Sequence, residues 1–92
     1  MLNATSWEEL KKQLRQLETK GKVVFKLERT NSMNDGVFCR VLYKVKPHEL
    51  IFLDRNQKSY LPVSVEMESA IEYFENGFKI CNCTYVLDRV EK

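Results

Sequence analysis

Residues 22–45 read KVVFKLERTNSMNDGVFCRVLYKV, and this stretch decides the fold that the sequence predicts. On both sides of residues 31–36, every second side chain is apolar. This period of two is typical of strands with one apolar face. The central run, residues 31–36, is rich in turn formers and ends in Asp-Gly. The stretch therefore predicts an antiparallel β-hairpin of strands 22–29 and 37–45.

The pairing of these two strands decides which side chains share a face. We expect residue 25 to lie opposite residue 41. The core side would then hold Val23, Phe25, Leu27, Cys39, Val41 and Tyr43. The other side, the basic sheet face, would collect Lys22, Lys26, Phe38, Arg40 and Lys44, with Val24 and Leu42 between them. A twisted sheet face with cations and an aromatic ring can bind phosphates and stacked bases.

Two interpretations of the basic sheet face stay open. Lys11, Lys12 and Arg15 on the preceding helix would add positive charge to a nucleic-acid-binding surface. However, the same pattern is typical of an ordinary solvated face, and Glu28 would lie among the cations. The net charge is only +2 and the sequence pI is about 8.4, below the value of about 9 that marks strong binders. Nucleic-acid binding is therefore the alternative interpretation.

A helix is expected before the hairpin, over residues 6–20. Ser6 and Glu9 have the spacing of a capping box, which satisfies backbone donors at a helix start. Trp7, Leu10, Leu14 and Leu17 recur at steps of three and four residues and would share one face. Lys20 and Gly21 favour the end of the helix there.

After the hairpin, the sequence predicts a short central strand over 50–53 and an edge strand over 60–63, which contains Pro62. A second helix is expected from Ser64 to Asn76, and a last strand from Phe78 to Val86 or beyond. The buried stripe of that helix would be Met67, Ala70, Ile71 and Phe74. The expected fold is a single α+β domain over residues 1–92, with an antiparallel four- to five-stranded sheet, two helices on one face and the order α-β-β-β-β-α-β.

The predicted second helix carries two candidate interaction features. Glu68, Glu72 and Glu75 would share one face, either as a solvated surface or as an acidic patch that docks a basic partner. Tyr73 falls outside the buried stripe and is the candidate exposed anchor of a protein interface. Charge is also segregated: residues 1–46 carry ten Lys/Arg and five Asp/Glu (10 − 5 = +5), and residues 47–92 carry five and eight (5 − 8 = −3).

Catalytic and metal chemistry have weak support in the sequence. The only histidine, His48, follows Pro47 in an expected turn, and neither a nucleophile elbow nor a glycine-rich phosphate loop is present. Cys81 and Cys83 would lie about 7 Å apart on one side of an extended strand, too far to share a metal easily. Cys39 is interpreted as a small core residue. We therefore expect neither an enzyme, nor a cofactor, nor a metal.

The chain is expected in the cytoplasm, or in the host cytoplasm if it is viral. Its longest apolar run, residues 50–53, is far too short for a membrane span, and three cysteines do not suggest a disulfide framework. A helix followed by strands is similar in outline to Sm-like proteins, but a helix over 64–76 would interrupt that pattern and no family motif is present. The element order of double-stranded-RNA-binding domains, α-β-β-β-α, does not match either, because this chain is expected to have a fourth and a fifth strand.

These observations favour a small non-enzymatic protein-binding domain that acts as an inhibitor, adaptor or regulator of a larger assembly. Its size would suit a phage or mobile-element protein. Aromatic anchors would supply affinity and the charged patches would steer encounter. We also expect a homodimer, formed through the edge strand over 60–63 or through the final strand.

Overall fold

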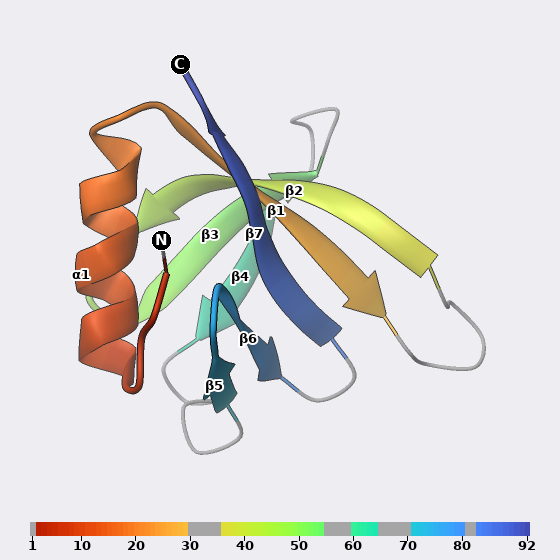
Figure 1. Ribbon diagram of the computed structural model, residues 1–92, viewed down its shortest axis with the longest axis horizontal. Coiled ribbons are helices and arrows are strands. Elements are labelled where there is room, and N and C mark those ends of the chain that lie inside the picture. The colour runs from red at the N-terminus through yellow and green to blue at the C-terminus, as the bar shows by residue number, and fades with distance from the viewer. Residues whose placement is uncertain (1, 30–35, 55–59, 65–70, 81–82) are drawn as a thin grey trace.

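The computed structural model describes residues 2–29, 36–54, 60–64, 71–80 and 83–92. Within them the chain forms one α-helix and seven β-strands, shown in Figure 1. The elements are α1 (Trp7–Glu18), β1 (Lys22–Arg29), β2 (Gly36–Val45), β3 (Glu49–Asp54), β4 (Tyr60–Ser64), β5 (Ile71–Phe74), β6 (Gly77–Ile80) and β7 (Cys83–Glu91). The strand pairs are antiparallel. The α+β class is confirmed, with sheet as its main component.

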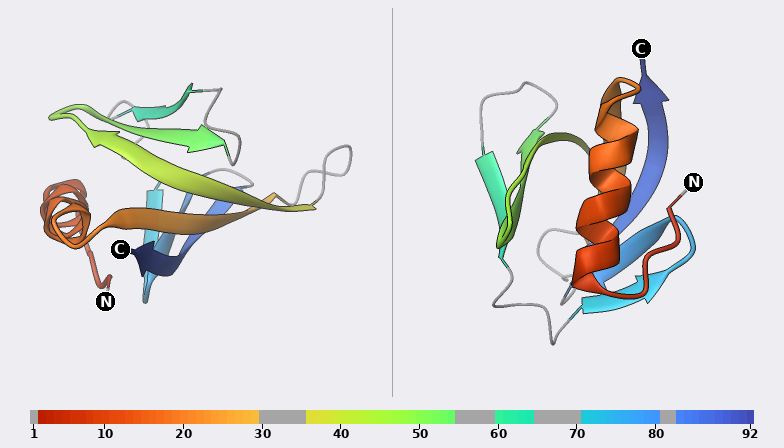
Figure 2. Two further views of the ribbon diagram at one scale, coloured as in Figure 1. Left: turned by 90° about the horizontal axis from the view of Figure 1, so that it is seen from above. Right: turned by 90° about the vertical axis from the view of Figure 1, so that its left-hand side faces the viewer.

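The strands form one curled sheet in the order β4-β3-β2-β1-β7-β6-β5. Its two edges, β4 and β5, follow one another in the sequence. In a flat sheet these edges would lie about 29 Å apart, whereas the seven residue steps from Ser64 to Ile71 span at most about 25 Å. The short connection therefore requires a curl. Figure 2 shows the result: β2, β3 and β4 form one side, β5, β6 and β7 the other, and α1 covers one open side.

Helix α1 begins and ends close to the predicted positions. The Ser6 hydroxyl accepts a hydrogen bond from the backbone N–H of Glu9 at 3.2 Å. The Glu9 carboxylate accepts from the hydroxyl and the backbone N–H of Thr5, at 2.8 and 2.9 Å, one residue before the position that a capping box uses. These hydrogen bonds hold the pKa of Glu9 below its usual value. The predicted stripe is confirmed, since Trp7, Leu10, Leu14 and Leu17 are all buried.

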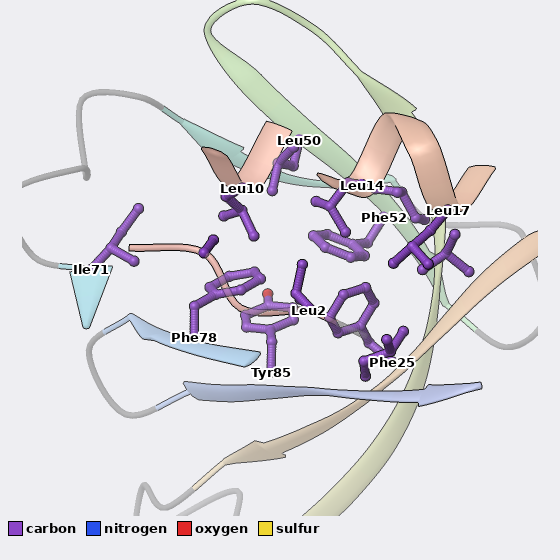
Figure 3. Close-up of a cluster of buried hydrophobic side chains, with 14 of the residues drawn as sticks. Leu2, Leu10, Leu14, Leu17, Phe25, Leu50, Phe52, Ile71, Phe78 and Tyr85 are labelled. Carbon is purple, nitrogen blue, oxygen red and sulfur yellow. The ribbon is translucent and has the colours of Figure 1, made fainter. Parts of the chain in front are cut away.

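Four aromatic rings join the two sides of the curled sheet in its core (Figure 3). Phe25 of β1 contacts Phe52 of β3 edge to face, with ring centroids 5.5 Å apart. It also meets Phe78 of β6 at 6.1 Å, and Phe78 stacks on Tyr85 of β7 at 4.8 Å. Such pairs add about 0.5–1.5 kcal/mol each beyond the area that they bury. Leucines of α1 close this cluster from one side.

Hydrogen bonds at two places anchor the helix and the N-terminal segment to the sheet. The carbonyl of Pro47, in the β2–β3 turn, accepts from Lys11 Nζ at 2.7 Å and from Trp7 Nε1 at 3.3 Å. Lys11 is consequently buried, with Glu8 as its ion-pair partner at 3.1 Å. At the other end, the backbone N–H of Asn76 donates to the carbonyl of Leu2 at 2.6 Å, next to the buried Leu2 side chain.

The predicted second helix is wrong over its last residues. Residues 71–74 form strand β5, and Asn76 lies in the turn that leads into β6. Residues 65–70, which include Met67, Glu68 and Ala70, lie outside the described residues. The expected last strand is instead two antiparallel strands, β6 and β7. Among the described residues the sheet therefore has seven strands rather than four or five.

The edges of the sheet were predicted in part. β3 is central and β4 is an edge strand, as expected. The final strand is not an edge over Cys83–Val86, because β1 pairs with one side of it and β6 with the other. It therefore offers no free backbone there to a second copy of the chain.

Candidate functional site

The register of the β1–β2 hairpin separates the residues of the predicted basic sheet face. Phe25 lies opposite Arg40, and Val24 lies opposite Val41. The expected pairing of residue 25 with residue 41 is therefore wrong by one residue. A one-residue shift moves every side chain of a strand to the other face. Phe38, Arg40 and Leu42 consequently share the inner face with Phe25, whereas Lys22, Lys26 and Lys44 stay on the outer face.

The same shift reverses the predicted burial along β2. Leu42, expected on the wet side, is buried in the core, and Tyr43, expected in the core, is 51% exposed. The β2–β3 register shifts at a β-bulge between Leu42 and Lys44. Cys39 lies opposite Lys26 on the outer face, half-buried, so its predicted place in the core is also wrong.

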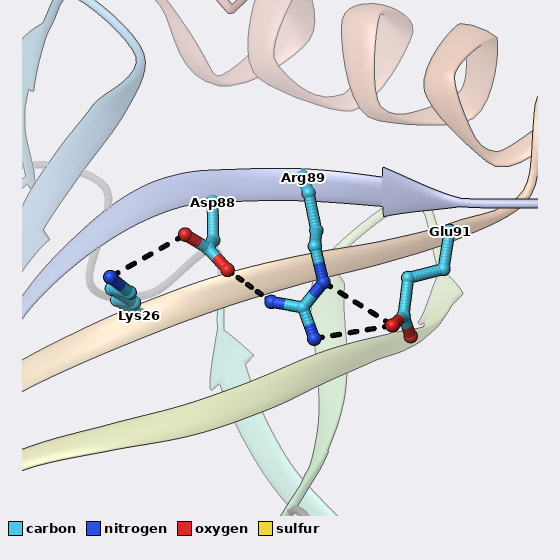
Figure 4. Close-up of polar contacts among 4 residues, drawn as sticks. All are labelled: Lys26, Asp88, Arg89 and Glu91. Carbon is cyan, nitrogen blue, oxygen red and sulfur yellow. Dashed lines mark hydrogen bonds and ion pairs between the residues drawn. The ribbon is translucent and has the colours of Figure 1, made fainter.

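On the outer face, strand β7 brings carboxylates to the lysines of β1. Asp88, at a β-bulge in the β1–β7 pair, lies 3.6 Å from Lys26 and also accepts a hydrogen bond from Arg89 (Figure 4). Arg89 also binds Glu91 at 3.2 Å, and hydrogen bonding to Asp88 and Glu91 raises the pKa of Arg89. Lys22 lies opposite Glu91 in the register. The outer face therefore carries both charges in near balance. This balance could not be predicted from the sequence, because it depends on β7 pairing with β1.

Two residues of the predicted basic sheet face, Arg40 and Phe38, lie close together on the inner face. The Arg40 guanidinium lies over the Phe38 ring, with Cζ 5.3 Å from the ring centroid, and donates to the carbonyl of Cys39 at 2.9 Å. Arg40 Nε is buried and has no hydrogen-bond partner among the described residues. Asp54 lies directly opposite Arg40 in the β2–β3 register. Lys12 and Arg15, on the exposed side of α1, lie on a different element from this pair.

The strand conformation of β5 reverses the predicted burial of two neighbouring aromatic residues, Tyr73 and Phe74. Ile71 and Tyr73 face inward, where Tyr73 packs against the hydrophobic core. Glu72 and Phe74 are exposed, with Phe74 at 37%. Tyr73 is therefore not the exposed anchor that the helical pattern predicted, and Phe74 takes that position. Alternation of apolar side chains at 71 and 73 is the sequence signal that points to this arrangement.

A row of small and apolar residues crosses the outer face from β5 to β7. Phe74 lies opposite Gly77, and Gly77 lies opposite Val86, which is 36% exposed. A Cβ on Gly77 would come within 2.9 Å of the Phe74 ring, so that ring lies directly over the glycine. The charged or polar side chains around this row are Glu72, Glu75, Lys79 and Lys26, which with Phe74, Gly77 and Val86 make up what we call the Phe74 face.

A shallow groove of about 230 Å³ borders the Phe74 face. One wall is the N-terminal segment, residues 3–5, and the other is the end of β5 with Tyr73, Phe74 and Glu75. The N-terminal wall is held by hydrogen bonds to α1, since Asn3 N–H donates to Gln13 at 2.8 Å and Thr5 bonds to Glu9. The exposed aromatic side chain and the groove therefore form one continuous surface.

The histidine and the cysteines that were considered for metal or catalytic chemistry are described only in part. Within the described residues, no three His, Cys, Asp or Glu side chains gather as a metal site would require. His48 is exposed, and Cys81 lies outside the described residues. The α1 helix, the one helix described, is too short and too polar to cross a membrane.

Comparison with known proteins returns no relatives. Neither a protein-family model, nor a curated protein, nor a solved structure matches the chain.

Proposed function

We propose that the chain is a small non-enzymatic protein-binding domain whose contact surface is the Phe74 face. One observation carries the proposal: an exposed aromatic ring lies over a glycine, beside the exposed Val86, within a rim of charged side chains. Aromatic anchors at the centre and polar side chains at the rim are the typical anatomy of protein interfaces.

The position of Phe74 favours binding for a second reason. Its ring is supported by the backbone of Gly77, and the groove formed by residues 3–5 lies beside it. A side chain that is already held in place loses less conformational entropy when a partner covers it. Lys26, Lys79, Glu72 and Glu75 at the rim would steer encounter without a large net charge.

The test is affinity purification from the source organism with wild-type protein and two matched variants. Phe74→Ser removes the exposed ring on β5, and Tyr43→Ser removes an exposed ring on the outer face of β2. We expect a stoichiometric protein partner with the wild type and with Tyr43→Ser, and its loss with Phe74→Ser. Equal recovery by both variants, or no stoichiometric partner from any of the three, would contradict the proposal.

Nucleic-acid binding is a second candidate, supported by the stacking of Arg40 on Phe38. The Asp88 carboxylate of β7 beside Lys26 reduces the positive charge of the outer face, which favours the protein-binding function instead. The alternative predicts that a labelled single-stranded oligonucleotide binds with an affinity that falls steeply between about 50 and 200 mM salt. Binding should also be lost in Arg40→Gln and kept in Lys12→Gln. A failure to bind at the lower salt concentration removes this candidate.

A further inference from the structure

We propose that the groove beside Phe74 takes an arginine side chain from an exposed segment of the partner protein. This inference rests on the proposed function, because the groove borders the Phe74 face and the arginine names the chemistry of its partner. The volume of the groove, the way its walls are held and the charge of its lining support the inference in turn.

The volume of the groove limits its occupant to about one side chain. It measures about 230 Å³, whereas sites for small organic ligands typically measure about 300–1,000 Å³. Its described lining comes from residues 3–5 of the N-terminal segment and from residues 73–75 at the end of β5. A single long side chain that lies between these two segments fits this space better than a cofactor does.

Asn76 joins the two walls of the groove. It directly follows Glu75 and has a φ of 65°, a left-handed conformation that asparagine adopts more readily than most residues. Its backbone N–H donates to the carbonyl of Leu2 at 2.6 Å, and its carbonyl accepts from the N–H of Leu87 at 2.7 Å. Its side-chain oxygen accepts from the N–H of Leu2 at 3.3 Å. The N-terminal segment is thereby held beside the β5–β6 hairpin (Figure 2), and walls that are held before binding lower its entropic cost.

Glu75 supplies the charge of the groove. It is the only charged residue among the described residues of the lining, and it is exposed. Within the described part of the chain its carboxylate has neither a hydrogen bond nor an ion pair. Glu72, by contrast, lies opposite Lys79 in the β5–β6 register, and Glu9 accepts hydrogen bonds from Thr5. A carboxylate without a partner in the wall of a groove favours a cation there.

The other wall gives an anion little to bind. The backbone N–H of Asn3 already donates to the side chain of Gln13 at 2.8 Å. The N–H and the hydroxyl of Thr5 both donate to the Glu9 carboxylate, at 2.9 and 2.8 Å. An anionic group would find these three donors engaged, and Glu75 would repel it. The groove therefore selects for positive charge.

The aromatic ring beside Glu75 favours arginine over lysine. Phe74 is 37% exposed and lines the same groove. A guanidinium can stack on an aromatic ring and pair with a carboxylate through two parallel N–H groups, whereas an ammonium is a compact and strongly hydrated charge. Elsewhere in this protein, Arg40 lies over the Phe38 ring in this way, with Cζ 5.3 Å from the ring centroid.

The first experiment follows the backbone amide NMR signals of the isotopically labelled full chain. The probe is the capped peptide acetyl-Gly-Gly-Arg-Gly-Gly-amide, and the controls carry glutamine or lysine in place of arginine. We expect shifts at residues 3–5 and 73–76 that saturate with a Kd of about 1–10 mM, no saturable shift with glutamine, and binding at least about threefold weaker with lysine. No saturable shift with the arginine peptide, or an equal response to either control, would overturn the inference.

The second experiment repeats the titration with Glu75→Gln and Glu72→Gln. Both variants remove one exposed carboxylate from the β5–β6 hairpin, but Glu72 is not part of the described lining of the groove. We expect Glu75→Gln to weaken binding of the arginine peptide at least about threefold, and Glu72→Gln to weaken it less than about twofold. The dispersion of the amide signals shows that each variant is folded. Equal effects of the two variants would overturn the assignment of the site to the groove.

These titrations separate the inference from the proposed function. If the arginine peptide does not bind, but recovery of a host protein is lost with Phe74→Ser, the arginine is refuted and the protein-binding surface is kept. If the peptide binds at the groove, but no stoichiometric partner is recovered, the arginine site is kept and the protein-binding function is refuted.

Discussion

Both the β1–β2 and the β5–β6 hairpin show a periodic pattern of apolar residues in their sequences. The pattern is sufficient to identify the strands of the first hairpin but not those of the second. In β1–β2, long runs of alternating residues identify two strands beyond doubt but leave their register open. In β5–β6, four residues form each strand, and a run of Ile71-Glu72-Tyr73-Phe74 fits a helix and a strand equally well. Length therefore decides whether periodicity can identify an element, and only pairing decides the register.

The largest effect is expected from a change at the centre of the β5–β6 hairpin. A Cβ on Gly77 would lie 2.1 Å from the backbone oxygen of Tyr85. Because backbone must move to make room, Gly77→Ala should lower the free energy of unfolding by more than about 3 kcal/mol. Lys79→Ala, in the same strand, should change it by no more than about 0.5 kcal/mol. Urea denaturation measures both, and similar values would show that β6 is not held against β7 as described.

A smaller effect distinguishes a strand from a helix at residues 71–74. Tyr73 packs against the core and Phe74 is exposed, so Tyr73→Ala should cost about 2–3 kcal/mol of unfolding free energy and Phe74→Ala less than about 1 kcal/mol. A helix with the stripe 67–70–71–74 would give the reverse order. Chemical denaturation of the two variants side by side decides between them.

The register of the β1–β2 hairpin is tested by two charge reversals. Arg40→Glu places a carboxylate on the inner face opposite Asp54, whereas Lys44→Glu changes an exposed residue of the outer face. We expect the first to lower the unfolding free energy by about 2 kcal/mol and the second by no more than about 0.5 kcal/mol. Equal effects in thermal or chemical unfolding would place the two residues on one face and favour the register in which residue 25 pairs with residue 41.

The smallest effect concerns the start of α1 and depends on pH. Hydrogen bonds from Thr5 lower the pKa of Glu9 in the folded state, so their contribution to stability is present above the pKa of the unfolded chain. It is lost as the pH falls through the lowered folded-state pKa. Glu9→Gln should therefore be slightly less stable than the wild type at neutral pH, and the difference should shrink as the pH falls through the lowered folded-state pKa of Glu9. A difference that is independent of pH would contradict this origin.

Much of the fold could be predicted because short-range patterns impose it. The apolar stripe of α1, its Ser6 cap and the strands around Phe25 and Phe52 all depend on side chains a few residues apart. For the candidate site, the sequence indicated the segment that carries an exposed aromatic residue but not which residue it is. An exposed aromatic residue was expected on the correct segment, but a helical interpretation chose Tyr73 in place of Phe74.

The sequence by itself determined the α+β class, the helix and the alternating strands, since propensity and periodicity act within single segments. Tertiary structure alone decided that Arg40 faces inward, that Asp88 neutralises Lys26, and that Phe74 meets Gly77 and Val86. Each of these depends on which strand lies beside which and in what register. A shift of one residue exchanges the two faces of a strand, so the register decides which side chains each surface presents.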